Sequence, residues 1–314
     1  MTVTGEASSR PTVLAIVGPT ASGKSDLAVA LAQQLDGEII NADSMQLYRG
    51  MDIGTAKLPV AERAGIAHHL LDVWPLDKSA AVAEYQSLAR ASIAEIAGRG
   101  RLPILVGGSG LYLRGTLDRL EFPGESPQLR QELATDLAEL GSHRLHQRLA
   151  AVDPAAAAAI LPSNGRRIVR ALEVIALTGG PFQARMPGFD ALYPGVQLGL
   201  DRSDLDDRVE RRVGRMMELG FLEEVRALLP AGLRAGPTAA KALGYQQLLA
   251  VLDDEGHLIG DLEAAVEATV RGTRRFVRRQ RSWFRRDPRI HWLDGAAGDL
   301  VAQASARLAT TLVR

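Results

Sequence analysis

The segment from Gly18 to Ser25, near the N-terminus of this 314-residue chain, has the residue types and spacing of a phosphate-binding loop. It reads GPTASGKS and lies between the apolar run 13–17 and a helical pattern that begins at Asp26. Its glycines let successive backbone N–H groups point at an anion, the helix start adds a positive dipole end, and Lys24 adds a charge. The Ser25 hydroxyl is of the type that binds Mg²⁺, which we expect as the cofactor. The predicted phosphate-binding residues are Gly18, Pro19, Thr20, Ala21, Ser22, Gly23, Lys24 and Ser25.

Three other segments follow predicted strands and carry polar groups. Asp43 leaves the second strand, where it is a candidate general base or a magnesium ligand through water, with a helix cap as the structural alternative. Ser109 offers a hydroxyl within the glycine-rich segment 107–112. Asp72 follows the third strand and is either a metal ligand or a structural residue. His68 and His69 are adjacent on a strand, so their side chains point to opposite faces, and we expect them to pack rather than to chelate one metal.

Residues 271–286 read RGTRRFVRRQRSWFRR and contain eight arginines and no acidic residue. At about 100° per residue, a helix places all eight arginines within an arc of about 160°. The opposite arc holds Phe276, Val277, Gln280, Trp283 and Phe284. This pattern predicts an amphipathic helix that docks by its apolar stripe and turns its arginines outward. Eight unneutralised like charges would repel one another, which favours a polyanionic partner such as a nucleic acid over a merely solvated face.

Short apolar runs alternate with helical patterns, which is typical of an α/β fold with a parallel sheet and helices on both faces. With the phosphate loop, this order predicts a P-loop NTPase-like fold whose ligands gather at the carboxyl ends of the strands. A helical insertion domain is expected where the strand pattern stops. The predicted core comprises residues 1–122 and 190–314, and the insertion comprises 123–189. The predicted strands are 13–17, 38–41, 70–73, 103–106, 196–200 and 290–293.

Composition bounds the class of protein. Lysine plus arginine and aspartate plus glutamate both number 37, so net charge points to no partner, and 46% of the residues are hydrophobic, as in a globular protein. The absence of cysteine excludes disulfides and cysteine-based zinc sites. The polar stretch 1–10 and the short apolar run after it do not match a signal peptide or a membrane span. We expect a cytoplasmic protein that makes no membrane contact and acts as a monomer.

Seven motifs in a fixed order resemble one known family. GPTASGKS, NADSMQLYRGMDIGTAK, HHLLDV, GGSGLYL, RRIVRALEV, KALGYQ and RRFVRRQRSWFR, over about residues 12–294, are similar to the motifs of the tRNA dimethylallyltransferases, also called tRNA isopentenyltransferases. In that family the loop holds the diphosphate of dimethylallyl diphosphate, and the prenyl group passes to the exocyclic amine of the adenosine immediately 3′ of the tRNA anticodon. The lack of cysteine matches the bacterial form, which has no C-terminal zinc finger.

The resemblance implies roles for single residues. Asp43 matches the general base, Lys24 and Ser109 match other catalytic positions, and Ser109 replaces a residue that is usually threonine. A flipped adenine is expected to reach the diphosphate through a channel. The residues that match tRNA-contacting positions are Asp43, Ser44, Met45, Gln46, Ser109, Arg130, Arg166, Arg167, Ile168, Val169, Arg170, Lys241, Ala242, Leu243, Gly244, Tyr245, Gln246, Thr273, Arg274, Arg275, Arg278, Arg279 and Gln280.

Three other functions are compatible with parts of the sequence. A small-molecule or nucleotide kinase would use the loop, Ser25 and Asp72 for ATP and Mg²⁺, but it leaves the arginine-rich segment unexplained. An isopentenyltransferase that acts on free AMP shares the loop and the base and has no use for long tRNA contacts. A non-catalytic RNA-binding module would not need a phosphate loop.

Overall fold

The structure is a computed structural model that describes residues 10–184 and 186–312. Within these residues the chain forms two compact units, one made of residues up to 118 and from 191 onward, the other of residues 119–190. No helix in the described part of the chain is both long and apolar enough to cross a membrane.

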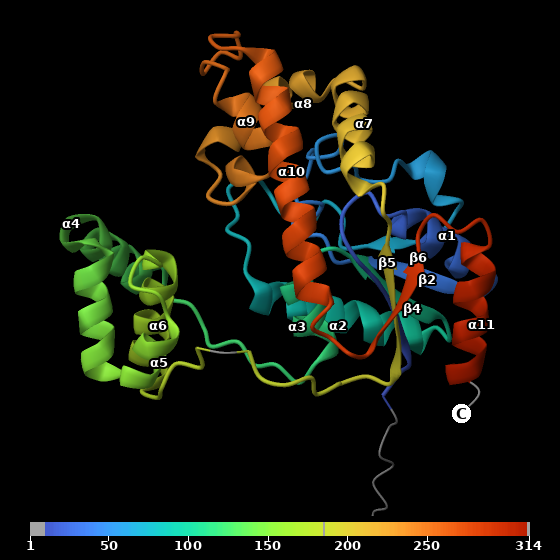
Figure 1. The fold of residues 1–314 in the computed structure, drawn as a ribbon, viewed down its shortest axis with the longest axis horizontal. Coiled ribbons are helices and arrows are strands. Elements are labelled where there is room, and N and C mark those ends of the chain that lie inside the picture. Colours follow the sequence, from blue (N-terminus) through green and yellow to red (C-terminus); the bar gives the residue numbers. More distant parts are fainter. Residues whose placement is uncertain (1–9, 185, 313–314) are drawn as a thin grey trace, which may run out of the picture. The chain divides into compact units, whose positions relative to one another are not determined.

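The first unit is built on a parallel sheet that has six strands among the described residues, in the order β3-β2-β4-β1-β5-β6 (Figure 1). The strands are β1 (Val13–Val17), β2 (Gly37–Asn41), β3 (His68–His69), β4 (Leu102–Gly107), β5 (Gly195–Asp201) and β6 (Ile290–Asp294). Because every pairing is parallel, all six carboxyl ends share one edge, where a ligand site is expected. The predicted fold class is therefore confirmed.

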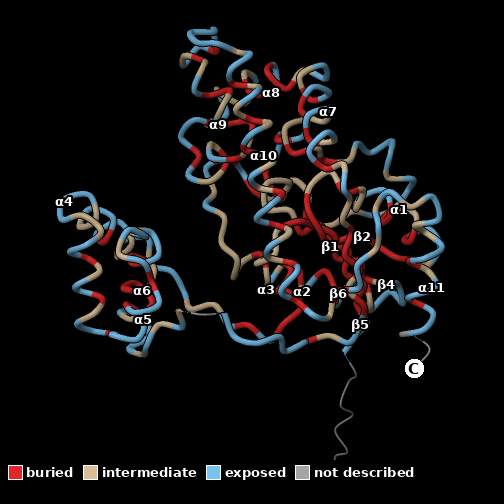
Figure 2. The backbone as a smooth tube through the Cα atoms, in the orientation of Figure 1, coloured by how far each residue is buried: buried red, intermediate tan, exposed pale blue. Residues whose placement is uncertain are grey.

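Helices cover both faces of the sheet, as the central strand requires. In β1 the side chains of Val13, Ala15 and Val17 belong to one core, and those of Leu14 and Ile16 belong to another. This period of two produces a strand that is buried on both sides. Helices α1 (Lys24–Gln34) and α11 (Leu300–Leu312) cover one face, and α2 (Val82–Gly98) and α3 (Gly110–Leu117) cover the other. Figure 2 shows the sheet as the most deeply buried part of this unit.

The third strand needs a correction. The sequence predicts it at 70–73, but the extended segment is only His68–His69. Leu70 and Asp72 have φ values of 61° and 57°, in the left-handed region, so the chain turns where the strand was expected. Of the apolar residues in this segment Leu70 is buried, whereas Leu71 and Val73 are partly exposed.

A helical layer covers part of the carboxyl edge of the sheet. It contains α7 (Leu205–Glu218), α8 (Phe221–Leu228), α9 (Tyr245–Leu249) and the long α10 (Leu262–Phe284). α10 packs against α7, α9 and α3. Asp261 caps its first turn through a bond from the backbone N–H of Ala264. The unit also has short 3-10 helices at Val60–Arg63, Leu233–Ala235 and Ala239–Lys241.

The second unit is helical and spans Arg119–Asp190, whereas the sequence predicts a helical insertion at 123–189. Its helices are α4 (Pro127–Val152), α5 (Pro154–Ala159) and α6 (Gly165–Thr178), and α4 is kinked at Gly141. A small apolar core of its own, which includes Leu145, Leu149 and Ile168, holds the three helices together.

Candidate active site

The predicted phosphate loop joins β1 to α1 and curls as the glycine pattern requires. Gly18 has a φ of 139°, and a Cβ there would lie 2.3 Å from the carbonyl oxygen of Leu200, so only glycine fits. Ala21 and Gly23 also have positive φ values, 66° and 95°. The N–H groups in the first turn of α1 have no acceptor within their own helix and are available to an anion.

Two side chains from distant helices hold this loop in place. The Gln280 side chain, on α10, accepts from the Thr20 N–H at 3.0 Å and donates to the carbonyl oxygen of Gly108 at 3.0 Å. Arg208, on α7, donates to the carbonyl oxygen of Ala21 at 2.7 Å. The loop is therefore held by side-chain hydrogen bonds to its own backbone groups.

Lys24 projects into the loop, where its Nζ donates to the carbonyl oxygen of Pro19 at 2.6 Å. Burial and the nearby Arg212 guanidinium lower its pKa from 10.5 to about 7, against the opposing effect of the Asp43 carboxylate. An ammonium that is this poorly compensated gains strongly from a bound polyanion.

Asp43 is held by its own turn at the carboxyl end of β2. Its N–H donates to the Asn41 side chain at 2.9 Å, and its Oδ1 accepts from the Met45 N–H at 3.0 Å. The other carboxylate oxygen has no hydrogen-bond donor among the described residues. Ser109 lies close by, since its hydroxyl accepts from the Ser44 N–H at 3.2 Å.

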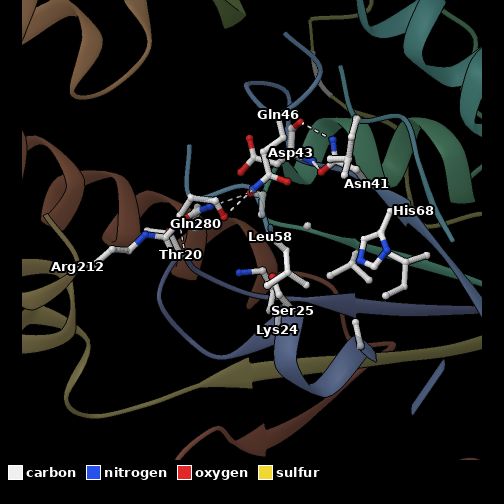
Figure 3. A pocket seen from close by; sticks show the side chains of 17 residues that line it. Thr20, Lys24, Ser25, Asn41, Asp43, Gln46, Leu58, His68, Arg212 and Gln280 are labelled. Carbon is white, nitrogen blue, oxygen red and sulfur yellow. Dashed lines mark hydrogen bonds between the residues drawn. The ribbon is translucent and has the colours of Figure 1, made fainter. Parts of the chain in front are cut away.

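Two neighbouring cavities lie at this edge of the sheet and share Thr20, Asp43 and Arg212. The first has a volume of about 80 Å³ and contains Lys24 and Ser25 on one side and Asp43 and Gln46 on the other (Figure 3). The second, of about 290 Å³, is more apolar. The side chains that line the second cavity include Met45, Ser109, Met216, Phe221, Lys241, Thr273, Phe276 and Arg279. Asp43 thus lies between the cavity that contains the predicted phosphate loop and a wider, more apolar cavity.

Arg212 is the site residue that sequence reasoning missed. It lines both cavities from α7, and its guanidinium donates to the carbonyl oxygen of Thr55 at 3.4 Å. Burial lowers its pKa, against the opposing effect of the Asp43 carboxylate. The signal that could have found it is its helical i, i+4 spacing from Arg208, on the helix that follows the fifth strand.

The structure decides the open readings of the third-strand segment. The Asp72 carboxylate accepts from Lys57 Nζ at 2.6 Å and does not line either cavity, so its role is structural. His68 and His69 diverge as predicted. His68 lines the first cavity, whereas His69 bonds to the buried Glu38 carboxylate at 2.6 Å.

The arginine-rich segment is helical and docks by the predicted stripe, with Val277, Gln280 and Phe284 buried. The expectation of an unneutralised arginine wall needs correction. Arg271, Arg274, Arg281 and Arg285 pair with the carboxylates of Glu267, Glu210, Asp201 and Asp201 respectively. In the described part of the chain Arg275, Arg278, Arg279 and Arg286 have no such partner, and Arg279 lies over the Phe276 ring.

Several other predicted tRNA contacts turn out to be buried. In the segment Lys241–Gln246, Lys241 and Gln246 are exposed, while the Ala242 and Tyr245 side chains and Gly244 are in the interior. The Gln280 side chain, 5% exposed, is fully used by the phosphate loop and Gly108. These buried groups position other residues and are not available on the surface.

In the second unit the predicted residues lie on α6 and at the start of α4. Ile168 and Val169 are core residues and need the same correction. Arg130 and Arg170 both pair with the buried Glu173 carboxylate at 2.8 Å. Arg166 and Arg167 lie on the surface of this unit.

Comparison with known proteins decides the family. Residues 46–287 match the IPP transferase family. The tRNA dimethylallyltransferase of Streptomyces avermitilis is 63% identical over 92% of both chains, and that of Streptomyces coelicolor is 59% identical over 96% of both. This chain belongs to the tRNA dimethylallyltransferase family.

Solved structures agree. The tRNA isopentenylpyrophosphate transferase of Bacillus halodurans is 39% identical, with a TM-score of 0.71 over 96% of this chain and 97% of that one. A eukaryotic dimethylallyltransferase acting on tRNA is 26% identical, with a TM-score of 0.80 over 96% of this chain and 79% of that one. The predicted family and enzyme class, a prenyltransferase of tRNA modification, are confirmed.

Proposed function

We propose that this transferase moves a dimethylallyl group from dimethylallyl diphosphate to the exocyclic amine of the adenosine immediately 3′ of the anticodon, giving isopentenyladenosine. The observation that carries the proposal is the placement of Asp43 between the Lys24 phosphate loop and a second, more apolar cavity. A prenyl transfer to adenine needs a site for the diphosphate on one side of the general base and a site for the adenine on the other.

The donor diphosphate would lie in the phosphate loop against Lys24 and Arg212. When the bond between the allylic carbon and the diphosphate oxygen breaks, the electron pair stays on the diphosphate. Backbone N–H groups and two cations stabilise that charge where it develops. Because Lys24 and Arg212 have depressed pKa values without a ligand, both gain from this charge.

Mg²⁺ fits the same place. The Ser25 hydroxyl and the Asp43 carboxylate are oxygen donors that line one cavity, and magnesium prefers a few protein oxygens together with substrate phosphates. Among the described residues, one group of acidic and histidine side chains is close enough to share a metal ion. It consists of Asp253, Glu255 and His257, and it does not line either cavity. Ser25 would hold the ion, which supplies further neutralisation of the leaving diphosphate.

The acceptor adenine would occupy the second cavity after leaving the anticodon stack. The amine nitrogen attacks the allylic carbon, the new N–C bond forms, and the amine proton passes to Asp43. Asp43 is suited to this role because the Met45 N–H fixes one oxygen and leaves the other free. The Ser44 N–H donates to the Ser109 hydroxyl, and both serines line the second cavity with Asp43.

Surface arginines favour tRNA over free AMP. Arg275 and Arg278, on α10, and Arg286, just after that helix, are exposed and have no carboxylate partner in the described chain, so phosphates could bind them. The kinase alternative loses its second carboxylate, because Asp72 is held by Lys57. We propose that the enzyme acts as a monomer in the cytoplasm.

One experiment separates these candidates. The protein is incubated with Mg²⁺ and labelled dimethylallyl diphosphate, and tRNA, AMP or ATP is offered in turn. We expect label in tRNA at the adenosine 3′ of the anticodon and none in AMP. Label in AMP alone would make the chain a free-nucleotide prenyltransferase, and tight ATP binding with no prenyl transfer would favour a kinase.

A further inference from the structure

The Glu224 carboxylate, on α8, is bound by four donors from two other parts of the chain. The N–H groups of Asp52, Ile53 and Gly54 donate to it at 3.0, 2.6 and 3.1 Å. The hydroxyl of Tyr245, on α9, donates at 2.5 Å. We call Glu224, Tyr245 and the turn 52–54 the carboxylate clasp. Within the described chain no cation pairs with Glu224, so its charge is compensated by backbone and hydroxyl dipoles.

Two aromatic rings, those of Tyr245 and Phe221, pack closely against the turn of the clasp. Tyr245 is fully buried and meets the Phe221 ring edge-on, with ring centres 4.9 Å apart. A Cβ at Gly54 would lie 2.1 Å from the Phe221 ring and 2.6 Å from the Tyr245 ring, so the turn lies directly on this aromatic pair. Burial and the neighbouring carboxylate raise the pKa of Tyr245, which keeps its hydroxyl protonated as a donor.

The residues that follow the clasped turn hold two side chains of the active site. The carbonyl oxygens of Thr55 and Ala56 accept from the Gln46 amide at 3.2 and 3.4 Å. The Thr55 carbonyl also accepts from the Arg212 guanidinium at 3.4 Å. Gln46 and Arg212 both line the first cavity beside Asp43. A shift of the turn would therefore move an amide and a cation at the reacting centre.

We propose that Glu224 and Tyr245 are positioning residues for the transfer reaction, acting through the turn 52–56 on Gln46 and Arg212. This inference rests on the proposed function, because Arg212 belongs to the proposed diphosphate site and Gln46 lines the same cavity as the proposed general base Asp43. Neither Glu224 nor Tyr245 lines either cavity. A displacement of about 1 Å in such a positioning network costs up to about 100-fold in rate.

The test uses the full-length enzyme and three variants. E224Q places an amide donor against the N–H and hydroxyl donors of the clasp, and Y245F removes one donor with little change of volume. E223Q is the matched control, since Glu223 is the neighbouring residue, is exposed, and pairs among the described residues with Arg226 alone. Prenyl transfer to tRNA gives kcat and KM, calorimetry gives the affinity for inorganic pyrophosphate, and far-ultraviolet circular dichroism checks folding.

We expect E224Q to lower kcat/KM about tenfold or more and to weaken pyrophosphate binding, Y245F to do the same less strongly, and E223Q to match the parent. The losses of E224Q and R212K should be less than additive in the double variant, because both act on one group. A folded E224Q with parental kinetics and pyrophosphate affinity would overturn the proposal. If E224Q does not fold, Y245F decides in the same way. If the parent enzyme binds pyrophosphate but transfers no prenyl group to tRNA, the proposed function is contradicted instead. The pyrophosphate affinities of the variants would still test the role of the clasp in that case.

Discussion

The Gln280 side chain accepts a hydrogen bond from the Thr20 N–H at 3.0 Å, joining the arginine-rich helix to the phosphate loop across 260 residues of sequence. The same amide donates to Gly108, so one side chain fixes both glycine-rich segments of the site. α10 is thereby joined directly to the phosphate loop and to the segment after β4.

Gln280→Leu should weaken inorganic pyrophosphate binding about tenfold or less, because it leaves the Thr20 N–H and the Gly108 carbonyl without partners and lets the loop relax. tRNA affinity should stay within about threefold of the parent, since the Gln280 side chain is buried. Calorimetry with pyrophosphate and filter binding with tRNA measure the two. The opposite pattern, lost tRNA binding with intact pyrophosphate binding, would restore the sequence-based assignment of Gln280 as a tRNA contact.

Asp43→Asn should reduce kcat for prenyl transfer by about 10²–10⁴, the usual cost of losing a general base, while tRNA affinity changes by only a few fold. The amide keeps the size of the side chain and still accepts from the Met45 N–H. Asp77→Asn, which changes an exposed carboxylate outside both cavities, is the control. Single-turnover kinetics give the rate. Near-parental turnover would leave Asp43 as a structural cap.

Lys24 should take up a proton when the diphosphate binds. Its pKa is about 7 without a ligand, so the amine is mostly neutral at pH 8.5, and a bound polyanion raises that pKa. Affinity should therefore fall as pH rises above about 7. Calorimetry of pyrophosphate binding at pH 8.5, in buffers that differ in ionisation enthalpy, counts the protons. Lys24→Arg corrects for protons exchanged by the ligand itself, and equal counts in both proteins would show that Lys24 is already charged.

Glu38 tests the stability of the opposite end of the sheet. Its buried carboxylate bonds to Arg99, Arg101 and His69. Burial alone would raise its pKa, but the hydrogen bonds from these three groups together lower the pKa to about 2. A carboxylate whose pKa is depressed on folding contributes stability above its unfolded pKa of about 4.3 and loses it as pH falls toward 2. Glu38→Gln should lower the urea midpoint at pH 6 and flatten its decline below pH 4. An unchanged pH profile would contradict this.

The sequence predicts the fold to within one or two residues for five of the six strands, because buried parallel strands are apolar runs that end at glycine or polar residues. The third fails because nothing local reveals the left-handed turn at Leu70 and Asp72. Site residues are predicted where each lies within a recognisable local motif, as Lys24 and Asp43 do in two separate motifs. Arg212 has no motif and is brought in by the packing of α7.

The same limit explains the charges of α10. The acids that neutralise Arg274 and Arg281 are Glu210 and Asp201, which lie 64 and 80 positions earlier in the chain. Local sequence shows a wall of like charge, while the fold supplies distant partners. Trp283, expected as an anchor, is only partly buried, although it packs against Gly110 of α3.

This pairing divides the arginines of α10 into two groups with different expected behaviour toward tRNA. Arg275 and Arg278 are exposed and have no carboxylate partner in the described chain, so a phosphate bound there releases counterions without breaking an ion pair. Each change to Ala should weaken tRNA binding evenly across tRNA sequences and reduce the slope of log affinity against log salt by about 0.7. Prenyl transfer at saturating tRNA should be nearly unchanged.

Arg274→Ala and Arg281→Ala serve as the comparison. Arg281 donates to the Asp201 carboxylate and to the Arg202 carbonyl, and Arg274 donates to Glu210 and to the Asp206 carbonyl. Since these guanidinium groups already have partners, their loss should lower the urea midpoint relative to the parent. It should reduce the salt slope less than the loss of Arg275 or Arg278 does. Filter binding between 50 and 200 mM salt, about the range over which phosphate contacts change affinity strongly, distinguishes the groups. If the Arg275 and Arg278 variants kept the parental slope, this face would be merely solvated and the tRNA would have to bind elsewhere.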